Sequence, residues 1–164
     1  MRIIGIDPGY AIVGYGVVDY VSGKFRTGDY GAIKTAPTDS FDRRLEEIYT
    51  DLSTVLDETK PEIMALEKIF FTTNQKTAID VAQARGVIIL TARTKNIRIA
   101  EYTPLQVKQA VTGYGKATKK QIQEMTVRIL SLDAVPKPDD VADALAIAIC
   151  GAHSNNSLIP RLNK

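Results

Sequence analysis

The chain has 164 residues, of which 45% are hydrophobic and 24% are charged, and its formal net charge is +2. This length and composition fit one folded globular domain and exclude a disordered chain. The single cysteine, Cys150, excludes a disulfide framework, and no apolar run approaches the roughly 20 residues that span a bilayer. We therefore expect a cytoplasmic protein that makes no membrane contact.

The N-terminal third predicts three consecutive strands. Residues 2–7 form a short apolar run that ends at Asp7-Pro8-Gly9, which is typical of a buried strand ending in a turn. Residues 13–20 and 24–35 are rich in Val, Tyr, Ile and Thr, and Ser22-Gly23 between them favours a hairpin. The three strands are expected to pair antiparallel.

The rest of the chain alternates helices and strands. Apolar residues at helical spacing predict a helix over 39–59, capped by Asp39 or Ser40. Four more helices are predicted, over residues 73–94, 104–111, 118–130 and 139–153. Short apolar strands are predicted over 63–66 and 97–102.

This order of elements predicts the fold class. An initial meander followed by strand–helix–strand units gives an α/β fold with a mixed sheet of five strands and helices on both faces. The organisation resembles that of ribonuclease-H-like domains. We expect a single domain over residues 1–153 and a polar, frayed C-terminal tail over residues 154–164.

Positive charge is concentrated in one part of the chain. Between Arg93 and Arg128 there are eight basic and two acidic residues, a balance of +6, whereas the remainder carries 13 − 17 = −4. Such a segment is either a phosphate-binding surface or a set of solvated lysines on helix faces. Charge alone leaves both interpretations open.

Two acids stand at the ends of predicted core strands. Asp7 follows the apolar strand 2–7, and Glu67 follows the strand 63–66. Ligand sites in open α/β sheets gather at such edges. The alternative for Asp7 is a turn aspartate that bonds the next backbone groups, and the alternative for Glu67 is a structural pair with an arginine. Taken singly, each acid leaves these alternatives open.

A second pair of acids begins the predicted last helix. Asp139 and Asp140 near its start are explained by helix capping alone, whereas Asp143 lies one turn inside a helix that is apolar almost all round. Asp140 and Asp143 share a helix face, and two like charges close together in a dry setting favour a bound cation. For this pair we favour metal binding over capping.

The four acids Asp7, Glu67, Asp140 and Asp143 together fit a two-metal phosphodiesterase. Mg²⁺ prefers hard oxygen ligands, and a pair of ions activates the attacking water and stabilises the leaving oxygen. The sequence has no Cys/His cluster for zinc, no phosphate loop ending in Gly-Lys-Ser/Thr, and only one histidine, His153. We therefore expect metal-assisted hydrolysis by two Mg²⁺ ions, with Mn²⁺ as a substitute.

Several motifs resemble one known family over nearly the whole chain. They are Gly5-Ile6-Asp7-Pro8-Gly9, Leu66-Glu67-Lys68-Ile69-Phe70-Phe71, Gln83-Ala84-Arg85-Gly86, Tyr102-Thr103-Pro104-Leu105-Gln106-Val107-Lys108 and Asp140-Val141-Ala142-Asp143-Ala144-Leu145-Ala146. In this order they resemble the RuvC family of Holliday-junction resolvases. The first motif alone is also found in sugar kinases and actin-like ATPases.

The resemblance implies a ribonuclease-H-like homodimer that nicks two opposed strands of a four-way DNA junction with Mg²⁺. It implies that Asp7, Glu67, Asp140 and Asp143 are catalytic and hold the metal, and it favours Asp140 over its neighbour Asp139. It also implies association with the RuvA–RuvB branch-migration complex.

The resemblance extends to residues that contact DNA. Lys108 and Lys119 match family lysines, and Lys116 or Lys120 could share the role of Lys119 because the preceding loop varies. Lysines of this kind contact phosphates and fix register without reading bases. Phe70 matches a family aromatic that could stack on unpaired bases, although from the residues alone it would be assigned to the core.

The helix predicted over 73–94 offers a dimer interface. Ala78, Ala82 and Gly86 recur every four residues and would let a partner helix approach closely, with Ile79, Val87 and Ile88 adding apolar area. A two-fold dimer would place two carboxylate sets on the two equivalent strands of a junction. The alternative is that this helix lies wholly inside its own core.

Three other functions compete with a junction nuclease. Another ribonuclease-H-like nuclease, acting on RNA or linear DNA, would share the acids and the basic segment. A junction-binding protein without catalysis would not need four acids. An actin-like ATPase needs two such domains, and 164 residues are too few for them.

Overall fold

The computed structural model describes residues 1–68 and 75–156. Its sheet has five strands: β1 (Arg2–Asp7), β2 (Ile12–Val21), β3 (Lys24–Lys34), β4 (Ile63–Glu67) and β5 (Arg98–Tyr102). Their spatial order is β3-β2-β1-β4-β5, with antiparallel pairing among β1, β2 and β3 and parallel pairing of β4 with β1 and β5. The predicted mixed sheet with an initial antiparallel meander is confirmed.

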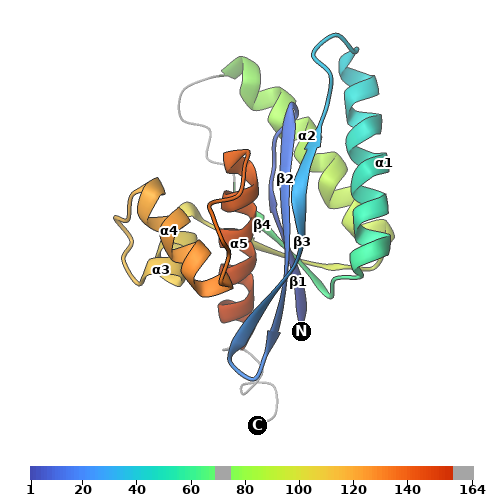
Figure 1. Cartoon of the computed structure of the whole chain (residues 1–164). Coiled ribbons are helices and arrows are strands. Elements are labelled where there is room, and N and C mark those ends of the chain that lie inside the picture. The colour runs from blue at the N-terminus through green and yellow to red at the C-terminus, as the bar shows by residue number, and fades with distance from the viewer. Residues whose placement is uncertain (69–74, 157–164) are drawn as a thin grey trace.

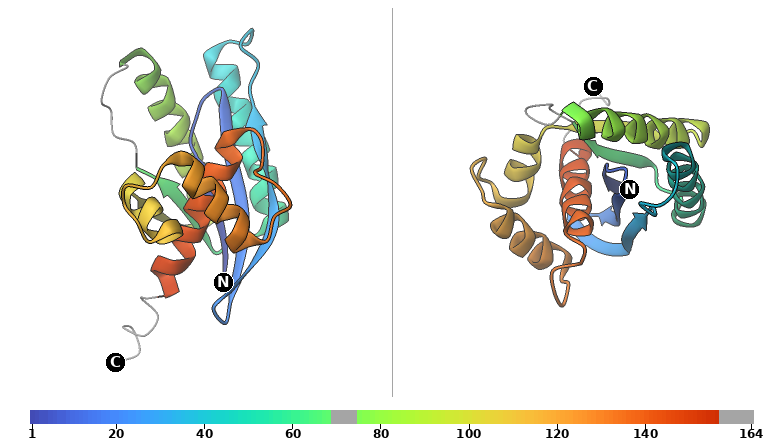
Figure 2. Two further views of the ribbon diagram at one scale, coloured as in Figure 1. Left: turned by 60° about the vertical axis from the view of Figure 1, so that its left-hand side comes forward. Right: turned by 90° about the horizontal axis from the view of Figure 1, so that it is seen from above.

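Helices cover both faces of this sheet, as predicted (Figure 1). They are α1 (Phe41–Thr59), α2 (Gln75–Thr94), α3 (Pro104–Thr112), α4 (Lys119–Leu130) and α5 (Asp139–Asn156). Helices α1 and α2 pack together on one face, and α5 packs on β1 and β2 from the other. Helices α3 and α4 lie outside α5, away from the sheet (Figure 2). None of the helices described is long and apolar enough to cross a membrane.

The predicted element boundaries are close to those observed except at the end of α5. We expected the last helix to end at residue 153, but it continues to Asn156. Asn155 is only 5% exposed, and its amide donates hydrogen bonds to the Tyr102 hydroxyl and the Gly151 carbonyl while accepting one from Arg98. These hydrogen bonds of Asn155 connect β5 to α5. The end of the helix was predicted from apolar residues alone, and a buried polar residue gives no such signal. The division into a domain and a tail from 154 stays a prediction, because residues 157–164 lie outside the described part.

Alternation along the strands divides the core into two layers. Side chains of successive strand residues point to opposite faces. Ile4 and Ile6 of β1 pack toward α1 and α2 with Leu52 and Ile88, whereas Ile3 packs toward α5 with Leu145. Gly5 and Asp7 therefore also point toward α5, which decides the face on which the site forms.

Three glycines let α5 lie directly on the sheet. A Cβ at Gly5 would collide with the backbone of α5 at Ala144, one at Gly14 would collide with the backbone of Asp140, and one at Gly16 would collide with the side chain of Leu145. We call Gly5, Gly14 and Gly16 the glycine seat. The register pairs Gly5 with Gly16 and Asp7 with Gly14, so the seat is one continuous strip beside Asp7. Small residues in the strands thus position the N-terminal turn of α5.

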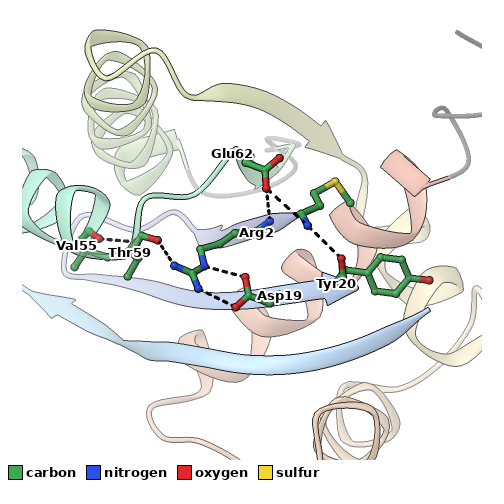
Figure 3. Close-up of polar contacts among 7 residues, drawn as sticks. Arg2, Asp19, Tyr20, Val55, Thr59 and Glu62 are labelled. Carbon is green, nitrogen blue, oxygen red and sulfur yellow. Dashed lines mark hydrogen bonds and ion pairs between the residues drawn. The ribbon is translucent and has the colours of Figure 1, made fainter. Parts of the chain in front are cut away.

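A separate polar network connects the opposite end of β1 to β2 and α1 (Figure 3). The Arg2 guanidinium donates two hydrogen bonds of 2.8 and 2.9 Å to the Asp19 carboxylate on β2 and one to the Thr59 carbonyl at the end of α1. The backbone N–H of Arg2 donates to Glu62 just before β4. This network joins β1, β2 and α1 at the end of β1 away from Asp7, and its role is structural.

The glycine seat leads to a prediction about stability. Replacing Gly14 by alanine puts a methyl group against the rigid backbone of α5, and overpacking of this kind costs about 1–3 kcal/mol of unfolding free energy. The control is Gly31→Ala on β3, where the nearest atoms to the added Cβ belong to the end of the Tyr15 side chain and not to a backbone. Urea unfolding of both variants measures the difference, and an equal cost for the two would contradict the assigned role of the seat.

Candidate active site

Asp7 and Glu67 lie side by side at the carboxyl ends of two neighbouring strands. β1 and β4 are parallel, and Ile6 is in register with Leu66, so the next residue on each strand is an acid. Ile3 on β1, and Ile63 and Ala65 on β4, belong to the core layer under α5. By alternation, both carboxylates point to that same face.

Helix α5 brings the other two acids to this edge. The backbone of Asp140 lies over Gly14, which pairs with Asp7 in the sheet. Asp143 follows one turn later and lines a pocket of about 230 Å³ together with Asp7 and Glu67. Asp140 is not among the residues lining this pocket, but its charge acts on Asp7.

Helices α3 and α4 supply the outer wall of the pocket. Lys108 of α3 and Lys119 of α4 line it together with five apolar residues, Pro104, Val107, Ile122, Ala146 and Ile147. Each of the two helices begins with a reciprocal capping box, formed by Thr103 with Gln106 and by Thr118 with Gln121. These caps fix where the helices start, and so they fix Lys119, which directly follows Thr118, and Lys108, little more than one turn after Thr103. The sequence analysis placed the lysines on a basic segment but did not identify the apolar part of this wall.

Burial and mutual repulsion disfavour ionisation of the two strand acids. Burial first, then the nearby charges of Asp143, Glu67 and Asp140, raise the pKa of Asp7 to about 7. Burial and the charge of Asp143 also raise the pKa of Glu67, while Lys108 opposes the shift. Neither acid forms an ion pair with a residue in the described ranges, so the arginine partner considered for Glu67 is not found there. A cation in the pocket would relieve this repulsion.

Lys119 neutralises the acid of α5 that lines the pocket. Its ammonium donates a hydrogen bond of 2.9 Å to Asp143 and lies 3.7 Å from Asp139, and the contact with Asp143 raises the pKa of Lys119. Asp139 is held more closely by Lys137, at 2.6 Å. Neither Asp139 nor Asp140 lines the pocket, so the choice of Asp140 stays a prediction.

The donor set is suitable for a hard divalent cation. It consists of carboxylates alone, and these are the oxygen ligands that such a cation prefers. Among the described residues, however, no group of three or more acidic, histidine or cysteine side chains is already arranged around one point for a metal. The Lys119–Asp143 ion pair occupies one of the oxygens that a metal would need.

The remaining predicted DNA-binding residues lie outside the pocket. Lys116 is exposed in the loop between α3 and α4, and Lys120 is exposed at the start of α4, 3.9 Å from Glu124. Phe70 falls outside the described residues.

The raised pKa of Asp7 leads to a prediction about how stability depends on pH. A carboxyl group whose pKa is raised on folding, here from 3.8 to about 7, destabilises the folded state as the pH rises through that interval. We expect Asp7→Asn to be more stable than the wild type at pH 8 without metal, by on the order of 2 kcal/mol, and the gain to disappear near pH 4. Urea unfolding in EDTA measures both values.

Asp19→Asn is the matched control, because the Arg2 guanidinium lowers the pKa of the Asp19 carboxyl. Stabilisation by Asp19 is present above its unfolded pKa and lost as the pH falls through its folded pKa. Asp19→Asn should therefore be less stable than the wild type at pH 8. If Asp7→Asn is no more stable than the wild type at pH 8, the ionised Asp7 carboxylate does not destabilise the folded state, and the prediction is wrong.

Nearly the whole chain is similar to one family of known proteins. The family model described as crossover junction endodeoxyribonuclease RuvC matches residues 3–151. The chain is 54% identical to a crossover junction endodeoxyribonuclease RuvC of Alkaliphilus oremlandii over 156 residues, 95% of both chains. It is also 54% identical to the RuvC of Clostridioides difficile, over 94% of this chain and 92% of the other.

Solved structures agree with these relatives. Thermus thermophilus RuvC in complex with a Holliday junction substrate is 35% identical, with a TM-score of 0.91 and 96% of each chain covered. The yeast mitochondrial Holliday junction resolvase Ydc2 shares the fold, with 15% identity, a TM-score of 0.71, and 98% of this chain and 81% of the other covered. With a family match over nearly its whole length and relatives at 54% identity, the chain belongs to the RuvC family of crossover junction endodeoxyribonucleases.

Proposed function

We propose that this protein is a structure-selective endonuclease that resolves four-way DNA junctions by paired, symmetric, metal-dependent hydrolysis in recombination and repair. The observation that carries the proposal is the pocket in which Asp7, Glu67 and Asp143 lie opposite Lys108 and Lys119. Acids in such a pocket suit a metal, and lysines suit DNA phosphates. The Thermus relative has been solved with a Holliday junction substrate, which supports the same substrate here.

Asp7, Glu67, Asp140 and Asp143 are the residues that would hold Mg²⁺, as two ions, with Mn²⁺ as a substitute. When bound, the metal supplies an activated water and stabilisation of the leaving oxygen. Without a metal these acids repel one another, and Lys119 pairs with one oxygen of Asp143. A cation held by the acids would reduce this repulsion, and the Lys119 ammonium beside them suits a DNA phosphate.

Other lysines extend the DNA contact beyond the pocket. Lys116 and Lys120 are exposed next to the pocket lysine Lys119, so all three are available to phosphates. A stacking role for Phe70 on unpaired bases stays a prediction from the family resemblance. Association with RuvA–RuvB stays a prediction from the same resemblance, and a cytoplasmic location stays a prediction from the sequence.

The active unit in this proposal is a homodimer joined through α2. Ile79 and Leu90 on this helix are 61% and 60% exposed, and both Ala82 and Gly86 are exposed, with open space at Gly86. The alternative of a helix wholly inside its own core is therefore wrong. One part of the predicted seam is also wrong, because Ile88 is fully buried against the sheet and leaves no area for a partner.

Removing the acids separates cleavage from binding. We expect Asp7→Asn, Glu67→Gln and Asp140→Asn to abolish cleavage of a synthetic four-way junction in Mg²⁺ while junction binding is retained or tightened, because each change removes negative charge near DNA. Asp139→Asn is the control, since Lys137 holds this acid outside the pocket, and it should still cleave. Gel assays measure cleavage and binding side by side.

Two results of these assays would count against the proposal. Folded variants that lose binding and cleavage to the same extent would contradict the assignment of the acids. A wild-type protein that cuts linear duplex as fast as the junction would favour another ribonuclease-H-like nuclease.

The dimer is tested by placing a charge in the proposed seam. Gly86→Glu should turn a dimer into a monomer at micromolar concentration, because an unpaired charge is costly to bury in an interface. Thr50→Glu, at an exposed position of α1, is the control and should leave the dimer intact. Sedimentation velocity measures both. Wild-type protein that sediments as a monomer while cutting both strands together would contradict the dimer.

A further inference from the structure

The tip of the α3–α4 hairpin exposes two large apolar side chains. Leu105, in the first turn of α3, is 53% exposed, and Tyr114, in the loop after α3, is 57% exposed. They belong to one surface, because a Cβ at Gly115 would collide with the end of the Leu105 side chain. We call Leu105 and Tyr114 the hairpin tip. The pocket chemistry does not use either residue.

Backbone hydrogen bonds fix the position of Tyr114. Its N–H donates to the Thr112 hydroxyl at 3.1 Å, and its carbonyl accepts from that hydroxyl and from the N–H of Ala117. Gly113 ends α3 in the left-handed conformation, at φ 72°, which favours glycine. The loop is therefore held in place, and the Tyr114 ring projects from a rigid support, so little ordering entropy is lost when a ligand binds it.

The same bonds connect Tyr114 to the pocket. The Thr112 hydroxyl also lies 2.8 Å from the carbonyl oxygen of Lys108, whose side chain lines the pocket together with Glu67. The hairpin tip is thus joined to the helix that forms part of the pocket wall.

The charges around the hairpin tip decide which partner it fits. Lys108 precedes Tyr114 on α3, and the exposed Lys116 and Lys120 follow it in the loop and in the first turn of α4, where the first acid, Glu124, lies 3.9 Å from Lys120. An exposed aromatic ring among lysines is the arrangement that binds single-stranded nucleic acid, with bases stacked on the ring and phosphates at the ammonium groups. An apolar protein partner would instead have to bury these lysines without counter-charges.

We propose that the hairpin tip is a contact site for an unpaired nucleobase, with the Tyr114 ring stacking on a base at the junction crossover and Leu105 supporting it. The inference rests on the proposed function and adds a specific contact to it. Because a fully paired duplex has no free base face, the contact contributes to junction binding and not to duplex binding. Selectivity for junction structure arises in part at this site.

The test compares Tyr114→Ala with Tyr114→Phe in EDTA, which prevents cleavage. The probes are a synthetic four-way junction that carries 2-aminopurine at the crossover and a linear duplex of the same sequence. Stacking energies predict that Tyr114→Ala binds the junction about tenfold more weakly and loses the fluorescence change, whereas Tyr114→Phe stays within about twofold of the wild type. Duplex affinity should be unchanged in both.

Salt dependence separates stacking from charge. Tyr114→Ala should keep the wild-type slope of log affinity against log salt, whereas Lys116→Ala should reduce the slope by about 0.9 through a lost phosphate contact. Junction affinity unaffected by Tyr114→Ala would overturn the inference, as would a Tyr114→Phe variant as weak as Tyr114→Ala. A wild-type protein with no preference for the junction over the duplex would instead overturn the proposed function.

Discussion

Helix α5 lies against the sheet at backbone contact, since Gly5, Gly14 and Gly16 place no side chain between the two. Every other feature of the site follows from this approach. It sets the first turns of α5 beside the ends of β1 and β4, where Asp7 and Glu67 stand in register. Two acids from the sheet and two from the helix are thereby brought to one edge by elements whose positions are fixed by the core.

The fold stabilises this accumulation of charge only partly. Burial and neighbouring acids raise the pKa of Asp7 to about 7, although Lys119, which pairs with Asp143, opposes this shift. Stability must come from elsewhere, from the two core layers and from contacts such as the Arg2–Asp19 pair. The buried acids therefore lower the free energy of unfolding, and the same acids are suited to bind a cation.

The sequence predicted most of the architecture, because strand and helix periodicities are strong in this chain. Asp7 and Glu67 follow apolar runs, and Asp140 and Asp143 begin an apolar helix. The sequence did not predict the glycine seat, since a glycine in a strand has several meanings until the helix above it is known. Nor did it predict the Lys119–Asp143 pair or the buried Asn155, which depend on residues distant in sequence. Ile88 was assigned to the seam because a helical repeat does not show which face the sheet covers.

The function assigned to the four acids depends most directly on metal binding. Crystals soaked in Mn²⁺ give an anomalous signal that locates the ion without reference to activity. We expect manganese, as two ions, beside Asp7, Glu67 and the acids of α5. Manganese bound only elsewhere, with no signal beside Asp7 and Glu67, would contradict this assignment.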